Sequence, residues 1–85
     1  MPYGNGELNE AEETELDLEM LREDLVGELN AINQYQAHIE TLDNEDAIRV
    51  LEHIRDDEKE HVAELTKLIQ KLDATQAAKF KKEGL

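Results

Sequence analysis

Apolar residues recur every three or four positions along two long stretches of the chain, residues 14–42 and 45–72. This spacing places them on one side of an α-helix, and neither stretch contains a proline. Between the stretches, the segment LDNEDA (42–47) has the composition of a turn, in which Asp43 or Asn44 caps the second helix. The pattern therefore predicts two long helices joined by a tight turn.

The two ends of the chain differ from this pattern. Residues 1–13 contain glycines and acidic side chains with little to bury, so we expect a flexible acidic arm that ends where Thr14 caps the first helix. Asp73 allows a break before a short third helix in TQAAKFKK (75–82). The sequence predicts an all-α fold, in which residues 14–85 form an antiparallel two-helix hairpin with a short C-terminal helix.

Each predicted helix has one continuous row of residues suited to burial against the other helix. The first row is Leu18, Leu21, Leu25, Glu28, Ile32, Tyr35, Ile39 and Leu42. The second row is Ala47, Leu51, Ile54, Glu58, His61, Leu65, Leu68 and Leu72. The polar members are Glu28 and Tyr35 in the first row, and Glu58 and His61 in the second.

Further apolar residues lie outside these rows and predict a second apolar face, made of Ile48, Val62 and Ile69 with Val26 and Leu29 opposite. Two helices cannot enclose this much apolar surface, and burying it stabilises a protein by about 25 cal/mol per Å2. We therefore expect a twofold dimer of hairpins, which makes a four-helix bundle.

The three ionisable members of the rows fall at one level of the hairpin. At about 1.5 Å per residue from Asn44, Glu28 lies roughly 24 Å along the first helix, and Glu58 and His61 lie roughly 21 and 26 Å along the second. Buried carboxylates without a partner cost several kcal/mol, and no lysine or arginine occurs in either row. A bound metal ion would supply the missing positive charge.

The ligand types and spacing match a known arrangement. Di-iron carboxylate bundles take a Glu from each of two helices and a Glu-x-x-His pair from each of the other two. One chain supplies half of this set, Glu28 with Glu58 and His61, and a symmetric dimer supplies all of it. Carboxylate and imidazole ligands favour iron or manganese, and the chain has no cysteine. A single E-x-x-H tetrapeptide is a weak signal, whereas its register with Glu28 makes the signal stronger.

Other candidate residues have plainer interpretations. Tyr35 is either a core aromatic residue with a hydrogen-bonded hydroxyl group or a residue that acts beside the metals. His38 and His53 fall outside the rows and are expected at the surface. His53, Asp57 and Glu60 share a neighbouring face, and the alternative for them is a weak outer cation site.

The composition limits the partners and the location of the protein. A formal net charge of −13 argues against binding to nucleic acid or to an anionic membrane surface, both of which require basic patches. No apolar run approaches the roughly 20 residues that span a bilayer, and the N-terminus has no apolar signal segment. We expect a soluble cytoplasmic protein whose partners are cations.

The segments GELNAINQY (27–35) and HIRDDEKEH (53–61) resemble those of the encapsulated ferritins, short ferritin-like chains built from a two-helix hairpin. The resemblance extends from about Leu18 to Phe80 and includes Tyr35 at the family's relative spacing. It implies a ferroxidase centre formed where two chains meet. In that centre, each chain contributes the metal ligands Glu28, Glu58 and His61 to bind a pair of irons. It further implies that dimers assemble into a ring inside an encapsulin nanocompartment, which stores the mineral.

The sequence also departs from that family. Gly27 and Asn30 stand where many members of the family have acidic residues that form a metal entry site. Gln34 stands where a tryptophan can precede the tyrosine. The segment KFKKEGL contains no evident shell-targeting tail.

The favoured function is a ferroxidase that oxidises Fe2+ with O2 and releases Fe3+ for storage. The alternatives are a peroxide-reducing di-metal protein of the rubrerythrin type and a metal-stabilised structural dimerisation module. The lack of rubredoxin-like cysteines argues against the first alternative.

Overall fold

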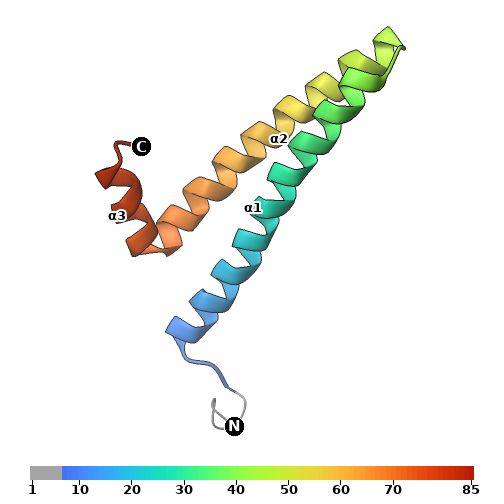
Figure 1. The fold of residues 1–85 in the computed structure, drawn as a ribbon. Coiled ribbons are helices and arrows are strands. Elements are labelled where there is room, and N and C mark those ends of the chain that lie inside the picture. The colour runs from blue at the N-terminus through green and yellow to red at the C-terminus, as the bar shows by residue number, and fades with distance from the viewer. Residues whose placement is uncertain (1–6) are drawn as a thin grey trace.

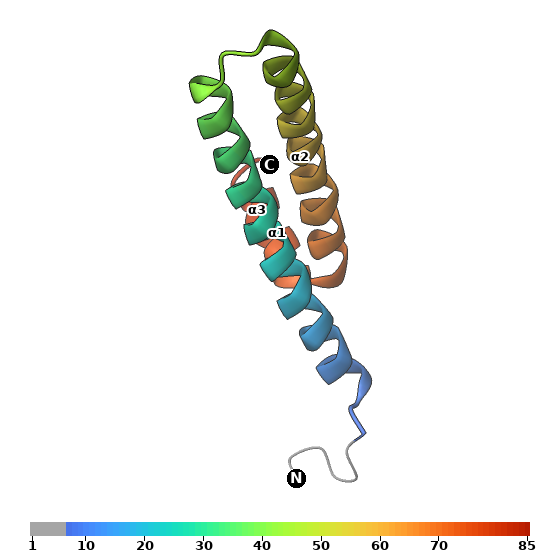
Figure 2. The same ribbon diagram turned by 90° about the vertical axis from the view of Figure 1, so that its right-hand side faces the viewer.

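The computed structural model describes residues 7–85, and the first half of the predicted arm lies outside them. Three helices make up the described chain: α1 (Glu10–Thr41), α2 (Glu45–Leu72) and α3 (Ala74–Lys82). The helices α1 and α2 lie side by side as an antiparallel hairpin, and α3 turns away from its open end (Figures 1 and 2). The all-α prediction with three helices is confirmed, whereas the pairing of two hairpins stays a prediction. Within residues 7–85, no helix contains an apolar stretch of the length that spans a bilayer.

The first helix begins earlier than the sequence pattern predicts. Asn9 is its N-cap, and the Asn9 side chain accepts a hydrogen bond of 2.8 Å from the backbone N–H of Glu12. Three glutamates in the first turn complement the positive end of the helix dipole. The predicted Thr14 cap is wrong, because the Thr14 hydroxyl group donates to the carbonyl oxygen of Glu10 inside the helix. Residues 10–13 therefore belong to α1.

The other helix boundaries agree with the predictions. The Asn44 side chain accepts from the Ala47 N–H at 2.9 Å and so caps α2. Asp73 ends α2 and caps α3, because its carboxylate accepts from the Gln76 N–H at 3.0 Å. The hairpin turn and the break between α2 and α3 are thus both fixed by capping side chains.

The core of a single chain is thin. Only Leu18 and Ile69 are buried among the described residues, with exposed fractions of 3% and 4%. Most members of the two rows are half-buried, and the row members that are exposed are Leu42, His61, Leu68 and Leu72. A lone hairpin therefore leaves much of its apolar surface in water, as the pattern indicated.

The second apolar face is not where the sequence predicted it. Ile69 is buried within the single chain, whereas Val26 and Leu29 are exposed, with exposed fractions of 57% and 48%. Ile48 and Val62 are half-buried. The α2 members of this set therefore pack within the chain, and only the two α1 members still require a partner.

Arg55 is a largely buried cation that sequence reasoning missed. Its side chain is 18% exposed, and its guanidinium group donates to Gln36 Oε1 at 2.8 Å and to Asp56 Oδ1 at 3.1 Å. It stands seven residues after Ile48 and seven before Val62, a spacing that would have indicated its burial.

Asp73 also joins α3 to the first helix. Its carboxylate accepts from Arg22 Nη2 at 3.0 Å, and its side chain is 20% exposed. The Gln76 backbone N–H, and after it the Arg22 guanidinium group, hold the pKa of Asp73 below its ordinary value of 3.8. The charged form of Asp73 is therefore favoured in the folded state.

Removing this carboxylate is expected to destabilise the α3 junction in a pH-dependent way. A folded pKa below the unfolded pKa stabilises the protein above about pH 4, and this stabilisation is lost as the pH falls through the folded pKa. Asp73→Ala should lower the melting temperature by about 4 °C at pH 6, and the difference from the parent should shrink at pH 3. Asp73→Asn keeps a capping oxygen, so its melting temperature should fall by less than that of Asp73→Ala. A difference that stays constant between pH 6 and pH 3 would contradict this role.

Candidate metal centre

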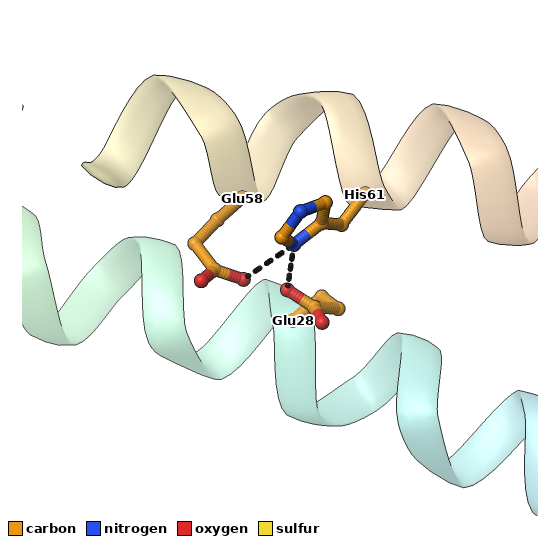
Figure 3. A group of neighbouring side chains, drawn as sticks. All are labelled: Glu28, Glu58 and His61. Carbon is orange, nitrogen blue, oxygen red and sulfur yellow. Dashed lines mark hydrogen bonds and ion pairs between the residues drawn. The ribbon is translucent and has the colours of Figure 1, made fainter. Parts of the chain in front are cut away.

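Three of the predicted site residues meet in the middle of the hairpin. Glu28 comes from α1, and Glu58 and His61 come from α2 (Figure 3). His61 Nδ1 lies 3.3 Å from Glu28 Oε2 and 3.4 Å from Glu58 Oε2. One ligand atom from each of the three residues lies within 4.8 Å of the other two, so a single ion could contact all of them.

The hairpin register produces this meeting. The two helices diverge from one tight turn at Asn44, so residues at similar distances from the turn face each other. Glu58 and His61 are three residues apart, which places both side chains on one face of α2. Glu28 reaches the same level from α1, as the helical rise predicted.

The charges at this site are not balanced by the protein. The Glu58 and Glu28 side chains are 17% and 26% exposed, and across residues 7–85 neither forms an ion pair with a lysine or an arginine. Their shared partner is one imidazole nitrogen, which can donate a proton to only one carboxylate oxygen at a time. A divalent cation would interact with both carboxylates and the ring together, so the donor set fits a metal ion.

The three side chains lie in an open groove on one side of the hairpin. The apolar part of the groove is lined by Ala31, Leu65 and Leu68. His61 is the most exposed of the three, with 48% of its side chain accessible. One chain thus presents Glu28 and the Glu58-x-x-His61 pair together on an accessible surface.

Acidic residues that sequence reasoning did not single out lie beside the three possible metal ligands. Asp24 and Glu23 on α1 and Glu64 on α2 line the same groove. Asp24 precedes Glu28 by four residues and Glu64 follows His61 by three, so helical spacing could have identified them. The groove is therefore acidic one turn from the group, although Gly27 itself carries no charge.

The remaining candidates do not join this group. Tyr35 is half-buried in α1 and is not part of the cluster of possible ligand atoms. His38 and His53 are exposed, as predicted. His53 Nε2 pairs with Asp57 Oδ2 at 3.2 Å, and in the described part of the chain no third ligand joins them in a metal-binding cluster.

Comparison with known proteins places this chain in a family. Residues 15–80 match the protein family described as ubiquinone biosynthesis protein COQ7. The chain belongs to this family. The COQ7 family is part of the ferritin-like di-iron carboxylate superfamily, so the predicted resemblance is confirmed at the level of the superfamily and not at that of the encapsulated ferritins.

Two curated proteins from Myxococcus xanthus (strain DK1622) are similar to the chain. The encapsulin nanocompartment cargo protein EncC is 49% identical over 61 residues, which are 72% of this chain and 47% of EncC. The encapsulin nanocompartment cargo protein EncB is 33% identical over 66 residues, which are 78% of this chain and 42% of EncB. The chain therefore spans less than half the length of these relatives. No solved structure gives a significant match.

Proposed function

We propose that this protein is a ferroxidase, which oxidises Fe2+ with O2 at a di-iron centre built by two copies of the chain. The observation that carries the proposal is the group formed by Glu28, Glu58 and His61, in which two carboxylates meet an imidazole without a neutralising lysine or arginine. Membership of a di-iron superfamily supports the same chemistry.

Each ligand has a distinct role in this proposal. Two copies together supply four carboxylates, and their negative charge favours Fe3+ over Fe2+. The His61 ring of each copy would hold one iron through an imidazole nitrogen. Two Fe2+ ions provide the two electrons that reduce one O2 to hydrogen peroxide, with two protons taken from water. Tyr35 lies two turns from Glu28 in the same row, and we propose that it acts beside the centre.

The relatives suggest where the protein works. Because EncC and EncB are named as encapsulin cargo proteins, we propose that this chain too resides in an encapsulin shell in the cytoplasm. There, dimers assembled into a ring would pass Fe3+ to the stored mineral.

Oxygen uptake after anaerobic loading with Fe2+ tests the activity. The proposal expects consumption of one O2 for two Fe2+, with loss of this uptake in His61→Ala. Peroxide consumption without O2 uptake would instead indicate a peroxide-reducing protein of the rubrerythrin type. Metal binding without either reaction would indicate a structural dimerisation module.

The acidic groove should attract Fe2+ through long-range electrostatics. Salt screens such attraction, with a Debye length of about 10 Å at 0.1 M. The oxidation rate at low Fe2+ should therefore fall by about threefold or more between 50 and 500 mM salt, whereas the rate at saturating Fe2+ should change little. Stopped-flow absorbance measures both rates, and a rate at low Fe2+ that does not depend on salt would contradict this role of the groove.

Added acids beside Glu28 should strengthen this attraction. In a single chain, a Cβ atom at Gly27 meets no atom within 4 Å and Asn30 is exposed, so both positions have room for a longer side chain there. Gly27→Glu with Asn30→Glu should lower the Fe2+ concentration for half-maximal rate by about threefold. The neutral pair Gly27→Gln with Asn30→Gln is the matched control. Equal iron dependence in the two folded variants would exclude an electrostatic effect.

A further inference from the structure

A pair of polar side chains joins the two helices of the hairpin outside the metal groove. Arg55 stands in a series on α2 with seven-residue spacing, in which Ile48 and Val62 are half-buried and Ile69 is buried. The Arg55 side chain is 18% exposed, and its Nη1 donates to Gln36 Oε1 on α1 at 2.8 Å. Neither partner lines the metal groove. A hydrogen-bonded pair thus takes a place that apolar residues fill elsewhere in the series.

Each member of this pair is also held by its own helix. Arg55 Nε donates to Asp56 Oδ1 at 3.1 Å on α2, and Gln36 Nε2 donates to Glu40 Oε1 at 3.0 Å on α1. The guanidinium group and the amide are therefore each oriented by a second hydrogen bond. Within residues 7–85, the Arg55–Gln36 bond is the one side-chain hydrogen bond between α1 and α2 that involves no proposed metal ligand.

The candidate metal site depends on how the two helices are placed against each other. Glu28 comes from α1, whereas Glu58 and His61 come from α2, so a slide or rotation of one helix moves these ligands apart (Figure 3). The ligands of a metal ion must be held within about 0.5 Å of their productive positions. The turn at residues 42–44 joins the helices at one end only. Apolar contacts are not directional, so the apolar rows alone do not set the placement of the helices this closely.

The polar pair stands where it can set this placement. Arg55 precedes Glu58 by three residues, which is about one helical turn, and Gln36 follows Glu28 by eight residues, or about 12 Å of helical rise. The pair therefore lies between the turn and the metal ligands, on the same two helices. Polar pairs buried between helices can fix their register at a cost in stability.

We infer that the Arg55–Gln36 hydrogen bond fixes the register of α1 against α2 and thereby positions the metal ligands. The pair holds Glu28 level with Glu58 and His61 without itself binding metal. This role gives a reason for a polar pair at a place where apolar residues of similar size would stabilise the hairpin at least as well. The inference rests on the metal site of the proposed function but not on its ferroxidase chemistry.

Binding of Co2+, used in place of Fe2+ because it is stable in air, tests the positioning role with the full chain. Gln36→Leu changes no charge and should weaken Co2+ binding by about tenfold. Arg55→Met removes a positive charge near the site, which by electrostatics alone would tighten the binding of a cation, yet we expect binding about tenfold weaker. The double variant should bind within about threefold of the weaker single variant, because both changes remove one interaction. Isothermal titration calorimetry measures the affinities, and the visible absorption of bound Co2+ reports its coordination.

Matched controls separate positioning from charge and stability. Gln34→Leu makes the same change at an exposed position on α1 and should bind Co2+ like the parent. Arg49→Met removes an arginine that is 66% exposed and pairs with Asp46 of its own helix, and it should not weaken binding. The metal-free double variant should melt at or above the parental temperature. Parental Co2+ affinity in the double variant would overturn the inference, as would weaker binding that is matched by a large loss of metal-free stability.

A metal-free measurement separates the inference from the fate of the metal centre. The chain has no cysteine, so spin labels can be attached at Asn33→Cys on α1 and Ala63→Cys on α2, which are both exposed positions. Electron–electron double resonance in EDTA, with each labelled chain diluted in its unlabelled counterpart, should show a narrow distance distribution in the parent and a broader or shifted one in the double variant. Equal distributions would overturn the inference. A difference in distances with no Co2+ binding by the parent would support the register role and contradict the metal site.

Discussion

Replacing Glu58 by alanine is expected to lower the rate of iron oxidation by about 100-fold or more without destabilising the metal-free protein. The substitution removes a proposed metal ligand, and it also removes a carboxylate whose side chain is only 17% exposed and which meets Glu28 across His61. Relief of this unbalanced charge should leave the melting temperature of the metal-free protein unchanged or raise it by a few degrees. Rapid-mixing kinetics and thermal unfolding measure the two effects on one preparation.

The matched control for Glu58→Ala is Glu60→Ala. Glu60 stands two residues later on the same helix and is exposed, so its loss should change neither rate nor stability appreciably. The prediction would be wrong if Glu58→Ala oxidised iron at the parental rate. It would also be wrong if the metal-free variant unfolded at a much lower temperature, because Glu58 would then support the fold and not the metal.

Metal ions are expected to tighten the association of two hairpins by about 100-fold or more. The complete ligand set exists only when two chains meet, so binding of metal and pairing of chains stabilise each other. Sedimentation of the protein with Fe2+ under anaerobic conditions, compared with EDTA, measures the change. His61→Ala should abolish the metal dependence and leave the metal-free association close to that of the parent. A monomer that binds iron as tightly as the assembled protein would contradict the shared site.

The regularity of the α-helix made the candidate site predictable. The rise per residue and the tight turn at Asn44 fix which residues stand level, so Glu28 could be matched with Glu58 and His61 without coordinates. The boundaries of α2 were predictable for another reason, because Asn44 and Asp73 have side chains that cap helices. Where the backbone geometry repeats from residue to residue, the sequence pattern is sufficient to predict which side chains lie at the same level.

Other features depend on interactions that a pattern does not contain. Asn9 and Thr14 are both competent caps, and the three glutamates that follow Asn9 favour the earlier start. Arg55 shares the seven-residue spacing of Ile48 and Val62, but its hydrogen-bond partners Gln36 and Asp56 do not follow from that spacing.

The direction of α3 also could not be predicted from the sequence pattern. It follows from the backbone at Asp73 and from the bond that Arg22 makes with the Asp73 carboxylate 51 residues along the chain. The exposure of His61 has a related cause, because the surface that would cover it belongs to another molecule in the proposed dimer.

The most direct test of a shared di-iron centre is a crystal structure of the assembled protein grown with Fe2+, with anomalous scattering recorded at the iron edge. We predict two iron peaks between two chains, each contacted by carboxylates of both chains, Glu28 and Glu58 among them, and each bound by one His61. Iron bound by a single chain, or a metal-loaded crystal with no peak among these residues, would contradict the proposed centre.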